Sequence, residues 1–135
     1  MKNEASMIGK CGMAFLFLNW MANRTPDVKP MLTGWDRKIQ FRLSGEEPFF
    51  IEIVDGHLKH RTGETHKPDL AFTSDSGKFF QVMIGRMKFD QGFSSGAYTI
   101  KGSIVDAVRL MRVAELAEGA HPTLMSLMKT ASRLI

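Results

Sequence analysis

The chain has 135 residues, of which 44% are hydrophobic and 24% charged, an ordinary composition for one globular domain. Its net charge of +4 is spread along the chain, so we expect no nucleic-acid partner, although a transient contact with an anionic membrane surface stays compatible. The single cysteine, Cys11, excludes an internal disulfide framework, and no segment reaches the roughly 18 apolar residues that span a bilayer, so we expect a cytoplasmic protein.

The first predicted element is a helix over residues 5–23, which is hydrophobic almost all round. One stripe consists of Met7, Cys11, Phe15, Leu18 and Ala22, and Met13, Phe17 and Trp20 add apolar surface on other faces. Such a helix is either buried on several sides or covered by another subunit. We expect a homodimer through residues 11–22, with burial inside the monomer as the alternative. Pro26 and Pro30 predict an irregular linker after the helix.

The hydrophobic period then changes from 3.6 to 2, which predicts a sheet over residues 37–74. Ile39, Phe41 and Leu43 alternate with polar residues, and residues 49–53 continue the pattern. Asp55-Gly56 predicts a hairpin, and a further strand is expected at residues 70–73. The apolar inner face and charged outer face are typical of an antiparallel sheet that is covered on one side.

The segment FSSGAYTIKG at residues 93–102 predicts a short strand over 97–101 and a sharp corner. Gly96 and Gly102 permit backbone conformations or close approaches that a Cβ would block. Ser103 and Asp106 resemble the start of a capped helix.

Three helices are expected in this half of the chain, at 75–84, 103–118 and 122–133, with Gly119 following the second and Pro122 opening the third. The second has an expected inner stripe of Ile104, Ala107, Val108, Met111 and Ala114. The third has one of Leu124, Leu127, Met128, Ala131 and Leu134. The elements together predict a single α+β domain over residues 1–135, a mostly antiparallel five-stranded sheet with helices on one face.

The sequence contains no pattern that nominates catalysis or metal binding. His57 and His60 are three apart on a predicted strand and therefore point to opposite faces, and no ligand spacing is completed around them or His66. Ser94-Ser95 has no nominated base. We therefore expect no enzyme, no metal and no cofactor. The ten methionines and ten phenylalanines are compatible with either an apolar binding cavity or a Met-rich core that contains no cavity.

From Pro68 onward, about 50 residues resemble the sterol carrier protein type 2 lipid-binding domain. The resemblance rests on a Gly-basic-apolar turn, a Phe and a Gly-rich strand, matched here by Gly85-Arg86-Met87, Phe93, Gly96, Ile100, Lys101 and Gly102. Ala97 and Thr99 stand where the family often has lysines, Tyr98 where it has leucine, and Ser103 where it has asparagine. In that family the strand and helix line an apolar tunnel, which the last helix covers.

The resemblance implies a non-catalytic carrier of a sterol, fatty acid, acyl-CoA or phospholipid. We expect the lipid to contact apolar residues on both sides of the corner, namely Phe79, Phe80, Met83, Phe93, Tyr98, Ile100, Met111, Leu124 and Met128. Of these, all but Phe80 and Ile100 should line one cavity of roughly 300–1,000 Å³. The alternatives are a structural or regulatory module with a filled core, and an enzyme acting on an acyl ligand, for which Gln81, Asp90 and Tyr98 are the available polar groups.

Overall fold

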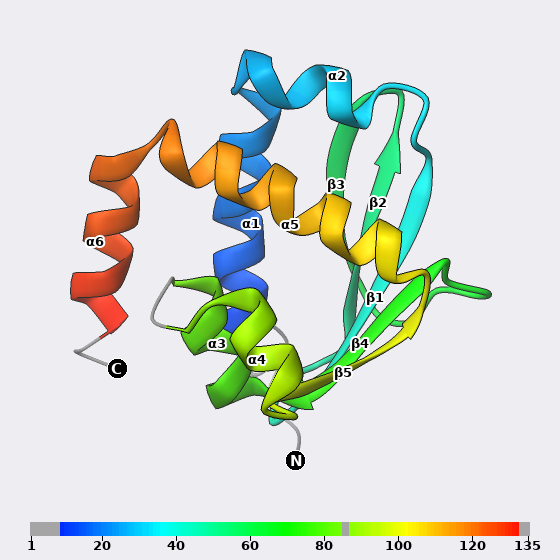
Figure 1. The fold of residues 1–135 in the computed structure, drawn as a ribbon, viewed down its shortest axis with the longest axis vertical. Helices are drawn as coiled ribbons and strands as arrows, with labels where there is room; N and C mark the ends of the chain where they lie inside the picture. Colours follow the sequence, from blue (N-terminus) through cyan, green and yellow to red (C-terminus); the bar gives the residue numbers. More distant parts are fainter. Residues whose placement is uncertain (1–8, 85–86, 133–135) are drawn as a thin grey trace.

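A five-stranded sheet forms one side of the molecule, with the strand order β3-β2-β1-β4-β5 (Figure 1). The computed structural model describes residues 9–84 and 87–132. Its strands are β1 (Arg37–Ser44), β2 (Phe49–Val54), β3 (His57–Thr62), β4 (Leu70–Asp75) and β5 (Tyr98–Gly102). The central pair β1 and β4 is parallel and the other three pairs are antiparallel. The predicted α+β class and mostly antiparallel sheet are confirmed.

The helices gather on one face of this sheet, and α5 runs across it in front of α1 (Figure 1). They are α1 (Lys10–Asn23), the 3₁₀ turn η2 (Pro26–Val28), α2 (Lys29–Leu32), α3 (Ser76–Met83), α4 (Phe89–Ser94), α5 (Ile104–Gly119) and α6 (Pro122–Ser132). The alternation in the sequence produces this arrangement, because Ile39, Phe41, Phe49, Ile51 and Ile53 all turn toward the helices and are buried.

The start of the first helix was predicted too early. Gly9 has extended backbone and the helix begins at Lys10; residues 5–8, including Met7, lie outside the described residues. No side chain next to the helix caps it. Instead the distant Glu46 accepts hydrogen bonds from the backbone N–H groups of Cys11 at 3.0 Å and Gly12 at 3.1 Å. A contact between residues about 35 positions apart leaves no local signal in the sequence.

Three other features differ from expectation. The segment after α1 is not irregular, because Pro26 and Pro30 each occupy the first turn of a short helix, where a missing N–H is tolerated. The short helix α4 was not predicted. Gly119 is the last residue of α5 and Ala120 caps it. The Gly85-Arg86 turn, the end of the last helix at 133 and Leu134 lie outside the described residues.

The outer face of the sheet is not uniformly charged, since Gln40 on β1 is completely buried. Its amide nitrogen donates to the carbonyls of Phe49 at 3.0 Å and Gly63 at 3.1 Å, and its oxygen accepts from Thr65 N–H at 2.8 Å. The loop after β3 therefore folds over this face, and the buried amide is satisfied on both ends.

The corner at residues 96–106 has the predicted geometry. Gly96 and Gly102 both have positive φ, at 78° and 119°. An added Cβ on Gly102 would lie 2.5 Å from the carbonyl oxygen of Asp69, whereas one on Gly96 would meet nothing within 4 Å. The Ser103 hydroxyl accepts from Asp106 N–H at 3.1 Å and caps α5.

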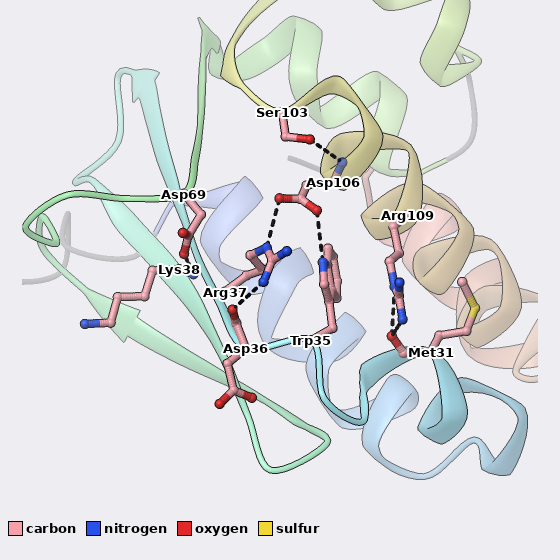
Figure 2. Close-up of polar contacts among 9 residues, drawn as sticks. All are labelled: Met31, Trp35, Asp36, Arg37, Lys38, Asp69, Ser103, Asp106 and Arg109. Carbon is pink, nitrogen blue, oxygen red and sulfur yellow. Dashed lines mark hydrogen bonds and ion pairs between the residues drawn. The ribbon is translucent and has the colours of Figure 1, made fainter.

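The first turn of α5 is tied to the start of β1 by a polar cluster (Figure 2). The Asp106 carboxylate accepts from the indole N–H of Trp35 at 3.0 Å and from Nε of Arg37 at 2.9 Å. Burial by itself raises the pKa of Asp106, but these two donors and the positive charge hold it below its usual value. One turn later, Arg109 donates twice to the carbonyl of Met31, at 3.0 and 2.7 Å. These contacts fix α5 over the sheet.

Candidate functional site

The space between the sheet and its helices is filled mainly by aromatic rings. Phe41 on β1 lies at the centre, with ring centroids 5.1 Å from Phe72, 4.4 Å from Phe15 and 5.8 Å from Phe79. Tyr98 on β5 extends the cluster, 5.5 Å from Phe79. Its hydroxyl donates to the carbonyl of Phe89, and burial raises the pKa of the phenol. Tyr98 is therefore a core residue whose hydroxyl is satisfied by a backbone carbonyl.

An apolar cavity opens on this cluster, between α1, α3 and α5. We call it the inner pocket, and its lining residues are Phe15, Leu18, Phe41, Phe72, Phe79, Val82, Met83, Leu110, Met111, Ala114, Glu115 and Glu118. Its volume is about 50 Å³, enough for a few water molecules. A cavity that holds a long-chain ligand usually measures about 300 Å³ or more, so the inner pocket is much smaller than expected.

A second depression, the outer groove, lies next to the inner pocket along α5. It is open to solvent, has a volume of about 560 Å³, and is lined by Val82, Met87, Lys88, Phe89, Asp90, Val108, Met111, Arg112, Glu115 and Glu118. Val82, Met111, Glu115 and Glu118 belong to both linings. The two spaces therefore adjoin at these four side chains, with the outer groove on the solvent side and the inner pocket on the core side.

One of the two carboxylates at this junction, Glu118, has a perturbed pKa. Glu118 is half-buried. Burial, together with repulsion by Glu115 one turn earlier, raises the pKa of Glu118 to about 7, and the positive charge of Lys129 on α6 opposes this shift. A carboxyl group that titrates near neutral pH can thus either accept or donate a hydrogen bond at the mouth of an apolar cavity.

The structure brings together three of the nine residues expected to contact a lipid. Phe79, Met83 and Met111 line the inner pocket. Tyr98 lies behind Phe79 in the aromatic cluster, and the half-buried Ile100 packs against the core.

The remaining four expected residues lie away from the inner pocket. Phe80 is on the other side of α3, where its ring packs under the ammonium of Lys10 at 5.2 Å. Phe93 on α4 is 46% exposed. Leu124 and Met128 on α6 are half-buried against the core but do not line the pocket.

Several lining residues were missed by the sequence reasoning. The sequence pattern placed Phe15 and Leu18 on the core stripe of the first helix and Phe41 on the inner face of the sheet. Phe72 falls within the strand expected at residues 70–73. The expected inner stripe of α5 was correct at Ala107 and Ala114, which are buried, and wrong at Ile104 and Val108, which are exposed. Leu110 and Ala117, which were not expected, are buried as well. Glu115 and Glu118 carried no signal, since a carboxylate near an apolar cavity has no sequence pattern that distinguishes it from a solvated one.

The last helix differs from its expected stripe in the same way. Met125, which was not expected, is buried, whereas Leu127 is exposed and Ala131 is also exposed. Small rotations of a helix about its axis decide such positions, and the packing partner sets the rotation.

No group of three potential metal ligands occurs within residues 9–84 and 87–132. His57 is exposed and His60 faces the helices, as the strand period predicts. The His60 ring stacks on Phe49 at 4.9 Å, burial lowers its pKa, and its Nε2 atom is buried without a hydrogen-bond partner in the described part of the chain.

Across the described residues 9–84 and 87–132, none of the helices has the length and apolar content to cross a bilayer.

The fold and the apolar space under α5 together define a class of small α+β domains with helices on a five-stranded sheet. The chain belongs to the SCP-2 sterol transfer family, whose model matches residues 18–115. The family resemblance seen in the sequence is thus confirmed.

Individual relatives agree with this assignment. The chain is 36% identical over 77 residues to hydroxysteroid dehydrogenase-like protein 2 of Xenopus tropicalis; the match covers 55% of this chain but only 18% of that protein. The solution structure of the sterol carrier protein domain 2 of Helicoverpa armigera superposes with a TM-score of 0.65 at 21% identity, covering 87% of this chain and 94% of the other. That of Aedes aegypti sterol carrier protein 2, in complex with palmitate, has a TM-score of 0.63 at 11% identity, covering 82% and 98%.

Proposed function

We propose that this protein is a non-catalytic carrier that binds the hydrocarbon part of a lipid between α3, α5 and the sheet. The observation that supports it is the inner pocket, whose lining is apolar except for Glu115 and Glu118 and which adjoins the solvent-open outer groove at four shared side chains. Family membership and the palmitate complex of the mosquito relative support a lipid as the ligand. The buried free thiol of Cys11 is compatible with a reducing compartment such as the cytoplasm.

Burial of the chain supplies the affinity in this proposal. At about 0.8 kcal/mol per buried CH₂, a 16-carbon chain gains on the order of 12 kcal/mol before the costs of ordering it and of opening the site. The inner pocket must widen for this, since its present volume is about 50 Å³. Met83 and Met111 line it, and methionine side chains change rotamer at little cost, so they are the groups that we expect to move.

Native mass spectrometry of the protein purified from cells tests the carrier directly. We expect a species whose added mass corresponds to one lipid, and solvent extraction should identify that lipid. A protein that carries no lipid, and that binds no fluorescent fatty acid or sterol at micromolar concentration, would contradict the proposal.

Substitution of Met111 tests where the lipid binds. Met111→Trp places a larger, stiffer side chain at the junction of pocket and groove, so a fluorescent fatty acid should bind at least tenfold more weakly, while circular dichroism stays unchanged. Val105→Trp is the matched control, because Val105 lies on the same helix and is 76% exposed. Equal binding by both variants would place the ligand elsewhere.

The small volume of the inner pocket favours a second candidate, an interaction module with a filled core. Its surface would be the outward side of α1, where Met13, Leu16, Phe17 and Trp20 are all exposed. We propose that a second copy of the chain covers this side in a homodimer, since leaving four large apolar side chains of one helix in water is unfavourable. This candidate predicts an empty dimer by native mass spectrometry, whereas the carrier predicts bound lipid.

A further inference from the structure

The junction of the inner pocket and the outer groove is where ionisable groups reach the inner pocket. Among the described residues that line the inner pocket, Glu115 and Glu118 are the only ionisable ones. Both sit on the same face of α5, three residues apart, and both also line the outer groove. A ligand whose chain fills the pocket therefore has its polar end, or the first atoms of its chain, next to two carboxyl groups.

We propose that Glu115 and Glu118 form a head-group subsite that favours a lipid with a hydrogen-bond-donating head, an ammonium or a hydroxyl, over a lipid with a carboxylate head. This inference rests on the proposed lipid-binding function and adds the chemical class of the ligand to it. An ionised carboxylate only accepts hydrogen bonds, so it pairs with an ammonium or hydroxyl and repels a second carboxylate. Glu118 is half-buried and Glu115 is exposed, so the apolar surroundings strengthen both effects mainly at Glu118.

Other charged groups surround this subsite and define the competing orientation. They are Lys88 and Asp90 at the start of α4, Arg112 on α5 and Lys129 on α6. Lys88 and Arg112 line the outer groove but not the inner pocket. A fatty-acid carboxylate that bound these two cations would stay outside the junction, and its affinity would not depend on Glu115 or Glu118. The two orientations are therefore separable by substitution.

The charge of the subsite changes near neutral pH. Glu118 titrates at about 7, so the subsite carries more negative charge at pH 8 than at pH 6. The preference for an ammonium over an alcohol should accordingly be larger at pH 8 than at pH 6, and a carboxylate should bind more weakly at pH 8.

Three ligands of equal chain length test the subsite: dodecylamine, dodecanol and laurate. Each displaces the neutral fluorescent probe N-phenyl-1-naphthylamine from the intact protein, below the concentration at which the ligand aggregates. At pH 8 we expect the wild type to bind dodecylamine at least about tenfold more tightly than laurate, as a charge-assisted hydrogen bond implies. Glu118→Gln should reduce this ratio, and Glu115→Gln combined with Glu118→Gln should abolish it.

Glu64→Gln is the matched control, since Glu64 pairs with Arg42 on the far side of the sheet, at 2.8 Å. It should leave the ratio unchanged. Equal affinities of the wild type for the three ligands, or a ligand order that survives the double substitution, would overturn the subsite while leaving lipid binding intact. Failure of all three ligands to displace the bound probe would instead contradict the proposed function itself.

Discussion

Replacement of Gly102 by alanine should be among the most damaging single-methyl changes in this protein. The residue has φ of +119°, and a positive φ costs a residue with a Cβ about 1–3 kcal/mol. The new Cβ would also lie 2.5 Å from the carbonyl oxygen of Asp69 and 3.1 Å from Cα of Leu70. Both are backbone atoms of the paired strand segment, so relief requires β5 to move, for about 1–3 kcal/mol more.

The sum predicts a loss of about 4 kcal/mol in the free energy of unfolding, measured by urea denaturation. Gly96→Ala is the internal control, because Gly96 has a similar φ of +78° but open space around its Cβ direction. It should cost only the conformational part, about 1–2 kcal/mol. Equal losses in the two variants would refute the argument from close approach, and a loss below 1 kcal/mol in Gly102→Ala would refute both parts of it.

Three further predictions follow from particular contacts. Burial lowers the pKa of His60, so on acidification this imidazole is protonated in the unfolded state before it is protonated in the folded state. The free energy of unfolding should therefore fall as the pH drops below about 6.5. His60→Phe should make the free energy of unfolding less dependent on pH in this range, and an unchanged pH dependence would contradict the role given to His60. Residues 122–132, whose helix packs through half-buried side chains, should exchange amide hydrogens faster than α5 and be slowed by a long-chain lipid; equal exchange with and without lipid would place ligand entry elsewhere. Phe17→Glu should abolish dimers in sedimentation at micromolar concentration, whereas Val105→Glu should not, and a monomeric wild type would end the dimer proposal.

The fold was largely predictable from the sequence because its signals are local. The period of two at residues 37–54, the Asp55-Gly56 turn and the capped start at Ser103 each depend on residues within a few positions of one another. The glycine corner could also be located in this way. Each of these features specifies its own conformation before any tertiary contact forms. Their predicted positions therefore agree with the structure to within one or two residues.

The candidate site was predicted less well, since cavities are properties of packing. Periodicity identified Phe79, Met83 and Met111 as apolar positions on the right helices, but it placed Phe93 and Tyr98 in the same lining. In the structure Phe93 is exposed and the Tyr98 hydroxyl bonds to a backbone carbonyl. The rotation of each helix about its axis decides which apolar residue faces a cavity, and that rotation is set by contacts with other elements.

The sequence by itself determined an α+β domain, its strands, the helices α1, α3, α5 and α6, the corner at Gly102, and the absence of any pattern typical of catalysis. Only the tertiary structure decided the features that depend on distant residues. Glu46 caps the N-terminus of α1 from about 35 positions away, and Gln40 is buried under a loop. Glu115 and Glu118 lie at the mouth of the inner pocket. A carboxylate acquires its charge state and its ligand preference from its surroundings, and those surroundings exist only once the chain has folded.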